Sequence, residues 1–107
     1  MEGLPLKFGL AQRHYRELIK VFSDHLKINQ VLIFGSRATG NAKSYSDFDL
    51  AVFAPSMNAR EFSALWDQID ALPLVFQIDL LHWDQLTDNC LKEKILLEGK
   101  LFYPEKN

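Results

Sequence analysis

Apolar residues recur at three- and four-residue steps along residues 11–26, with charged residues between them. This spacing places the apolar side chains on one face of a helix. The expected buried stripe consists of Tyr15, Leu18, Ile19, Phe22 and Leu26. Residues 31–34 then form an apolar run that stops at Gly35, which is typical of a strand covered on both faces.

The next segment, residues 35–46, is rich in Gly, Ser, Asn and Thr and has no sustained period. It predicts a loop, with room for one helical turn after Gly35. Residues 47–53 resume a strand-like pattern that ends before Pro55. The sequence therefore predicts two strands joined by a polar loop.

A capping box predicts where the second long helix begins. Asn58 is followed three residues later by Glu61, and the two can satisfy each other's backbone N–H groups. The helix that follows should end at Pro73. Its expected apolar stripe is Phe62, Leu65, Trp66, Ile69 and Leu72.

Three further elements are expected in the last third of the chain. Residues 74–83 predict a strand that carries one carboxylate, Asp79. Residues 87–98 predict a helix that stops at Gly99, and residues 101–103 predict a short final strand. The helix residues expected to face inward are Leu91, Ile95 and Leu96. Because helices and strands alternate, the order predicts one α/β domain over residues 1–107.

Composition narrows the class of protein. With 107 residues and 48% hydrophobic residues, the chain is long enough to bury a core without disulfides. Its single cysteine, Cys90, indicates a reducing compartment, and we expect a cytoplasmic protein. No apolar run approaches the ~18–20 residues of a transmembrane helix. The residues near the N-terminus also lack the pattern of a signal peptide.

Charge is distributed unevenly around a net value of −2. Residues 1–46 carry seven basic and three acidic side chains, whereas residues 47–90 carry one basic and eight acidic ones. A protein that grips nucleic acid through Lys and Arg usually has a basic face. We therefore expect no strong nucleic-acid footprint, and any phosphate contact should use a bound cation or a small local site.

The most informative chemistry is Gly35-Ser36 followed, after ten residues, by Asp47-x-Asp49. Side chains at i and i+2 of a strand share a face, and two such carboxylates ionise readily when a cation lies between them. Mg²⁺ suits oxygen ligands and often retains substrate phosphates. A glycine after a strand also lets the backbone approach a phosphate, to which Ser36 can hydrogen-bond. Taken singly, the two motifs are more often an ordinary acidic strand end and an ordinary turn.

The segment GSRATGNAKSYSDFDL resembles the signature of the minimal nucleotidyltransferases of the DNA polymerase β superfamily. Outside the Gly-Ser and Asp-x-Asp pairs, the resemblance rests on residues spread over most of 28–103: Arg37, Ala38, Gly40, Ser46, Asp79 with Leu80 and Leu81, Glu98, Gly99 and Tyr103. It implies a small mixed β-sheet packed with helices, as in polymerase β-like nucleotidyltransferases. Two Mg²⁺ ions and ATP, or another nucleoside triphosphate, are the implied cofactors and substrate.

The resemblance also implies roles for individual residues. Asp47 and Asp49 would hold the Mg²⁺ bound to the nucleotide, and Gly35 and Ser36 would hold its phosphates. Asp79 would complete the metal site and act on the incoming hydroxyl as a base or as a second-metal ligand. Two alternatives to Asp79 are Asp84 and Asp70. Arg37 either contacts phosphate or pairs with an acid and stabilises the loop.

The resemblance implies a biological role as well. Such proteins typically act as antitoxins that transfer AMP to a tyrosine of a helical HEPN-domain toxin, which would be the partner in a hetero-oligomer. One alternative is a non-catalytic module that binds nucleotide and masks the HEPN partner. Another is a transferase that modifies a small molecule such as an antibiotic.

Overall fold

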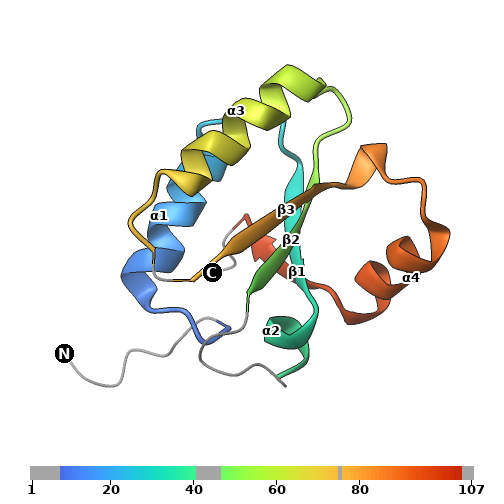
Figure 1. The fold of residues 1–107 in the computed structure, drawn as a ribbon, viewed down its shortest axis with the longest axis horizontal. Coiled ribbons are helices and arrows are strands. Elements are labelled where there is room, and N and C mark those ends of the chain that lie inside the picture. Colours follow the sequence, from blue (N-terminus) through green and yellow to red (C-terminus); the bar gives the residue numbers. More distant parts are fainter. Residues whose placement is uncertain (1–7, 41–46, 75, 105–107) are drawn as a thin grey trace.

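The computed structural model describes residues 8–40, 47–74 and 76–104, and within them the sheet has four strands in the order β3-β2-β1-β4 (Figure 1). This mixed sheet with helices confirms the predicted fold class. Of the loop predicted over residues 35–46, the part from 41 to 46, including Ser46, lies outside the described residues. In chain order the elements are α1 (Gln12–Ser23), β1 (Gln30–Phe34), α2 (Ser36–Thr39), β2 (Phe48–Phe53), α3 (Ala59–Asp70), β3 (Ile78–His82), the 3₁₀ turn η1 (Trp83–Gln85), α4 (Asn89–Glu98) and β4 (Lys100–Tyr103).

Strand directions bring three separate parts of the chain to one edge of the sheet. β2 runs antiparallel to β1 and parallel to β3, and β4 runs antiparallel to β1. The end of β1 therefore lies beside the beginnings of β2 and β3. In the register, Phe34 of β1 faces Asp49 of β2, and Asp49 in turn faces Asp79 of β3.

The sheet is covered differently on its two faces (Figure 1). Helices α1 and α3 pack on one face and bury the larger core cluster, which includes Leu18, Phe22, Leu65 and Ile69. Helix α4 packs on the other face, where Ile95 joins Phe34 and Ala51 in a smaller cluster. Because strand side chains alternate between faces, Asp49 and Asp79 share the α4 face with Ala51.

The capping box predicted for the second long helix is present at the start of α3. The Asn58 side chain accepts a hydrogen bond from the Glu61 backbone N–H at 2.8 Å, and the Glu61 carboxylate accepts one from the Asn58 N–H at 2.9 Å. Asp88 caps α4 in a similar way, accepting from the Leu91 N–H at 3.1 Å. Within the described residues, no helix combines the length and apolar character needed to cross a membrane.

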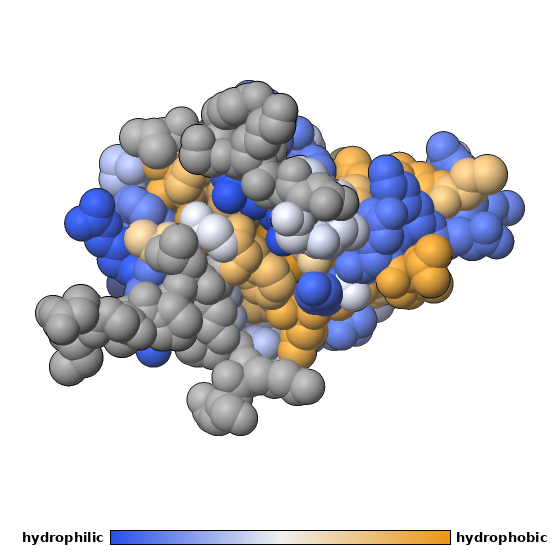
Figure 2. Space-filling view, turned by 90° about the horizontal axis from the view of Figure 1, so that it is seen from below, coloured by the Kyte–Doolittle hydropathy of each residue, from blue (hydrophilic) through white to orange (hydrophobic). Residues whose placement is uncertain are grey.

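Two leucines predicted to face inward do not. Leu26 is 96% exposed, because α1 ends at Ser23 and the following turns bury Ile28 instead. Leu96 is 62% exposed, because Leu91 and Ile95 already occupy the inner face of α4 and each further residue turns by about 100°. Figure 2 shows apolar surface at the end of the molecule formed by α4.

The third strand is shorter than the predicted 74–83. β3 begins at Ile78, which is the register partner of Phe48, the first residue of β2. Residues that precede Ile78 thus lie beyond the described ladder. β3 ends at His82, one residue before the predicted end, and Trp83 opens η1. The final strand is confirmed, one residue longer than predicted.

Candidate functional site

A sharp turn connects β1 to α2. Gly35 has φ 77° and ψ −156°, a conformation that is essentially restricted to glycine. A Cβ atom at this position would lie 2.7 Å from Oδ2 of Asp49. Glycine thus permits both the turn and the close approach of its backbone to this carboxylate. Ser36 follows as the first residue of the short helix, as the sequence predicted for this loop.

The carboxylates of the Asp-x-Asp motif meet Asp79 at this edge of the sheet. Asp49 and Asp79 are directly opposed on β2 and β3, and Asp47 immediately precedes β2 as an exposed residue. Burial raises the pKa of Asp49, and the negative charges of Asp79 and Asp47 raise it further. The other two acids predicted from the sequence are therefore close enough to Asp49 to act on its carboxylate.

This donor set fits Mg²⁺ in its chemistry. Hard divalent cations prefer carboxylate oxygens, and Mg²⁺ commonly takes one or two of them and completes its shell with water and substrate phosphates. A cation would also relieve the repulsion that raises the pKa of Asp49. Across residues 8–40, 47–74 and 76–104, no three His, Cys, Asp or Glu side chains form a preassembled metal cluster. The site therefore fits a cation that arrives together with its own further ligands.

Asp79 is oriented by its neighbour in the chain. The Gln77 side-chain amide donates a hydrogen bond of 3.3 Å to Oδ1 of Asp79. This contact leaves Oδ2 of Asp79 available for other partners. Nothing in the sequence pattern singled out Gln77, because the contact depends on the extended chain that leads into β3.

Arg37 is buried rather than displayed to solvent. It is 8% exposed, and its Cζ lies 4.1 Å from the centroid of the Phe48 ring. A Cβ atom on Gly9 would lie 2.6 Å from Nη1 of Arg37, so the preceding turn also packs against the guanidinium. Since Phe48 lies between Asp47 and Asp49, Arg37 ties α2 to the strand that carries the Asp-x-Asp pair. This contact supports the loop-stabilising role.

The two alternatives to Asp79 lie elsewhere. Oδ2 of Asp84 accepts a hydrogen bond from the Ala54 N–H at 2.8 Å, beyond the carboxyl ends of β2 and β3. His82 reinforces this junction, with Nε2 2.8 Å from the Ala54 carbonyl oxygen. Asp70 is exposed at the last residue of α3. Asp84 therefore stabilises the opposite end of the sheet, and neither acid joins the carboxylate pair.

Sequence reasoning missed Lys94. The positive charge of this α4 residue opposes the effects of burial and of the two acids on the pKa of Asp49. No motif marks Lys94, which lies among 17 residues at the end of the chain that carry four basic side chains. Only the packing of α4 on the sheet shows that it belongs near the site.

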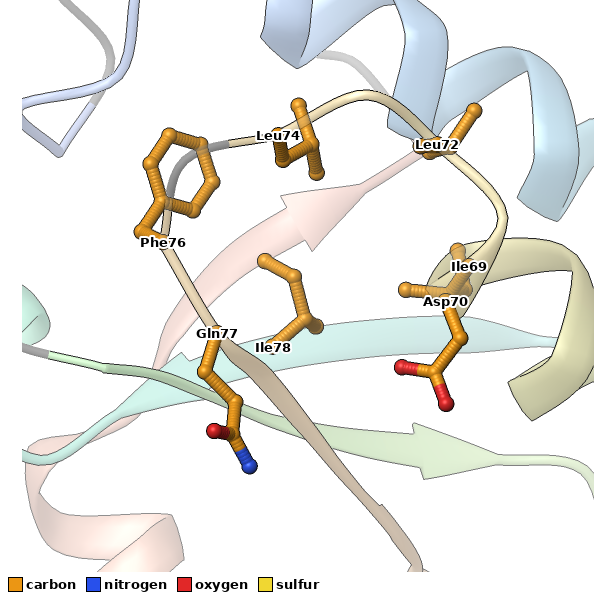
Figure 3. Close-up of a pocket in the computed structure, with 7 residues that line it drawn as sticks. All are labelled: Ile69, Asp70, Leu72, Leu74, Phe76, Gln77 and Ile78. Carbon is orange, nitrogen blue, oxygen red and sulfur yellow. The ribbon is translucent and has the colours of Figure 1, made fainter.

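A pocket of about 390 Å³ lies between the end of α3 and the beginning of β3. In Figure 3 the side chains of Leu74 and Ile78 point toward one another across it, and the Gln77 amide points away from them. Ile78 belongs to the core beneath α1 and α3, on the face of the sheet opposite Asp79. The pocket therefore lies on the opposite face of the sheet from Asp79, although Gln77 both lines it and contacts that carboxylate.

Solved structures share this fold. A toxin–antitoxin structure with AMP-PNP aligns with a TM-score of 0.69 at 22% identity, covering 86% of this chain and 74% of that one. The toxin–antitoxin MntA–HepT aligns at 0.64 and 21% identity, covering 89% and 74%. A tri-AMPylated Shewanella oneidensis HEPN toxin in complex with MNT antitoxin aligns at 0.58 and 21% identity, covering 88% and 72%. No curated protein sequence matches the chain.

Solved structures that are about 20% identical to this chain show that the fold is shared. A match between most of the chain and the model of a protein family shows that the chain belongs to that family. Residues 16–107 match the family described as Polymerase beta, Nucleotidyltransferase. The match includes the turn at Gly35, the Asp-x-Asp pair and Asp79. The chain therefore belongs to the polymerase β-like nucleotidyltransferase family.

Proposed function

We propose that this protein is a Mg²⁺-dependent nucleotidyltransferase that transfers AMP from ATP to a hydroxyl group. The observation that carries the proposal is the opposition of Asp49 and Asp79 beside the Gly35 turn. Asp47 adds a third carboxylate at the same edge. The negative charges of Asp79 and Asp47 raise the pKa of Asp49, and a bound cation would relieve that repulsion. The adjoining turn offers backbone and hydroxyl donors for phosphate.

Each residue has a defined task in this reaction. Asp47 and Asp49 hold the Mg²⁺ that accompanies ATP, while Ser36 and the backbone at Gly35 bind the terminal phosphates. Mg²⁺ neutralises phosphate charge and helps to align the reacting groups. The acceptor oxygen attacks the α-phosphorus in line, and the bond to the α,β-bridging oxygen breaks to release pyrophosphate. Asp79 removes the acceptor proton or holds a second Mg²⁺.

We further propose that the acceptor is a tyrosine hydroxyl of a HEPN-domain toxin and that the protein acts as its antitoxin. Support comes from the shared fold with an MNT antitoxin in complex with a tri-AMPylated HEPN toxin. The charge pattern agrees with this, because residues 47–90, which carry the three carboxylates, have eight acids and one base. Such a surface disfavours a nucleic-acid acceptor.

The test is to incubate the protein with α-labelled ATP, Mg²⁺ and the product of the neighbouring gene, tested as the HEPN-domain partner. Intact mass analysis of the partner should show additions of AMP with the wild type. The double variant Asp47→Ala, Asp49→Ala should add none. Asp67→Asn removes an exposed acid from α3 and should label normally.

The same experiment separates catalysis from masking. If the double variant still neutralises the toxin and no label appears with any variant, the protein acts as a binding module. If an aminoglycoside is added to the same mixture and takes up label while the HEPN protein does not, the acceptor is a small molecule. Either result rejects transfer to a HEPN tyrosine.

A further inference from the structure

Helix α4 lies across the face of the sheet that carries Asp49 and Asp79. Its residue Ile95 is fully buried with Phe34 and Ala51. Phe34 is the register partner of Asp49, and Ala51 follows Asp49 by two residues on the same face. The middle of α4 is therefore anchored beside the strand positions that hold the carboxylate.

Two lysines flank the buried stripe of this helix. At about 100° per residue, Lys92 and Lys94 fall on opposite sides of Leu91 and Ile95. The Nζ atom of Lys92 lies 5.2 Å from the centroid of the Trp83 ring. Trp83 follows the carboxyl end of β3, so the Lys92 side faces away from the beginning of that strand. The Lys94 side consequently faces the end of the sheet where Asp49 and Asp79 lie.

The electrostatics agree with this placement. From this position the ammonium of Lys94 lies within Coulombic range of the Asp49 carboxylate. Lys94 is exposed and, in the described part of the chain, its Nζ forms no ion pair within 4 Å. The site thus has a nearby cationic side chain that no acid holds in a fixed position.

We propose that Lys94 binds the triphosphate of the nucleotide and the pyrophosphate that leaves from it. An ammonium on a four-carbon stem is a mobile point charge suited to phosphate oxygens. Binding of nucleotide with its cation to Asp47 and Asp49 brings phosphate negative charge to the space that Lys94 borders. The role in transfer rests on the proposed function, whereas nucleotide binding is measured independently of it.

The alternative is that Lys94 only offsets the negative charge of the three acids. The two roles predict opposite responses to loss of the ammonium. If Lys94 contacts the phosphates, loss of its ammonium weakens nucleotide binding and leaves the binding of a bare divalent cation unchanged or stronger. If Lys94 only offsets the charge of the acids, the cation that arrives with the nucleotide takes over that task. Loss of the Lys94 ammonium would then leave nucleotide affinity unchanged or higher.

The experiment compares Lys94→Ala with Lys92→Ala, a matched loss of charge on the other side of α4. Calorimetry with Mg²⁺ and α,β-methylene-ATP, whose α,β-bridging carbon prevents transfer, measures nucleotide affinity. Mn²⁺ binding without nucleotide is followed by electron paramagnetic resonance, and thermal unfolding checks the fold. We expect Lys94→Ala to weaken nucleotide binding about tenfold or more, from loss of a charge-assisted contact. Lys94→Arg should retain most of the affinity, and Lys92→Ala should change it less than about twofold.

Unchanged nucleotide affinity in a folded Lys94→Ala protein would overturn the proposal, as would equal losses in the Lys92 and Lys94 variants. Failure of the two proposals is distinguishable. Binding that depends on Lys94 without AMP transfer to any acceptor would reject the proposed function alone. AMP transfer with nucleotide affinity that is insensitive to Lys94 would reject only the phosphate contact.

Discussion

Asp49 and Asp79 are directly opposed on the parallel strands β2 and β3. Like charges in opposed positions of a sheet destabilise it, and partial burial of Asp49 adds to the cost. The backbone of Gly35 reaches the same carboxylate from β1. The end of the sheet thus gathers negative charge beside a turn that suits phosphate, which is the arrangement that a nucleotide with its cation would stabilise.

The raised pKa of Asp49 predicts a specific pH dependence. Because the folded state holds the Asp49 proton more tightly than the unfolded state, stability falls as pH rises from the ordinary value of 3.8 through the folded pKa. Asp49→Asn should remove this loss and be more stable than wild type at pH 7 in EDTA. Urea unfolding from pH 3.5 to 7 measures the difference. Parallel profiles for the two proteins would contradict the prediction, and Asp67→Asn is the control.

Asp79 should be needed more for transfer than for binding. Asp79→Asn keeps the side-chain shape and the Gln77 contact but removes the base. We expect nucleotide to bind while AMP transfer falls by about a hundredfold or more, as is usual when a general base is lost. Single-turnover labelling together with calorimetry separates the two effects. Equal loss of binding and transfer would make Asp79 a ligand of the nucleotide's cation or a structural residue.

Gly35 and Gly40 provide a matched pair of substitutions. Both have positive φ, but a Cβ on Gly35 would strike the Asp49 carboxylate, whereas one on Gly40 would meet no atom of the described residues within 4 Å. Each change to Ala should cost about 1–3 kcal/mol of stability from backbone strain. Only Gly35→Ala should also weaken Mn²⁺ binding, because it displaces Asp49. Similar Mn²⁺ affinities for both folded variants would show that the close approach is unimportant.

Loss of the Arg37 side chain should mainly lower the stability of the folded protein. Its guanidinium is buried over the Phe48 ring, and a desolvated cation–π contact of this kind contributes about 2 kcal/mol. Arg37→Ala should therefore lower the free energy of unfolding by about 2 kcal/mol or more. The exposed Arg60→Ala should change it by less than about 0.5 kcal/mol. An Arg37 variant of normal stability that fails to bind nucleotide would favour a phosphate contact instead.

Local signals in the sequence were sufficient for most of the secondary structure. The Asn58 and Glu61 pair locates the start of α3, because a capping box is made by residues three apart. The apolar run at 31–34 locates β1 because its side chains pack on both faces of the sheet. The Gly-Ser and Asp-x-Asp spacing likewise identified the family, since these residues lie where β1 ends and β2 begins, and these two strands are consecutive in the sequence.

Long-range packing decided the rest. Leu26 and Leu96 fit their helical patterns, but a helix that ends at Ser23 and an inner face already filled by Leu91 and Ile95 leave both exposed. The choice between Asp79 and Asp84 depends on register, because one faces Asp49 and the other binds the Ala54 N–H at the far end of the strands.

The sequence by itself determined the elements, the family and the motif that carries the carboxylates, because each is written in residues a few positions apart. The resemblance predicted Asp79 as the third carboxylate, but only the tertiary structure shows it directly opposite Asp49 and brings Gln77 and Lys94 to the same site. Strand order and the packing of α4 set those relations, and both depend on contacts between residues that are distant in the chain.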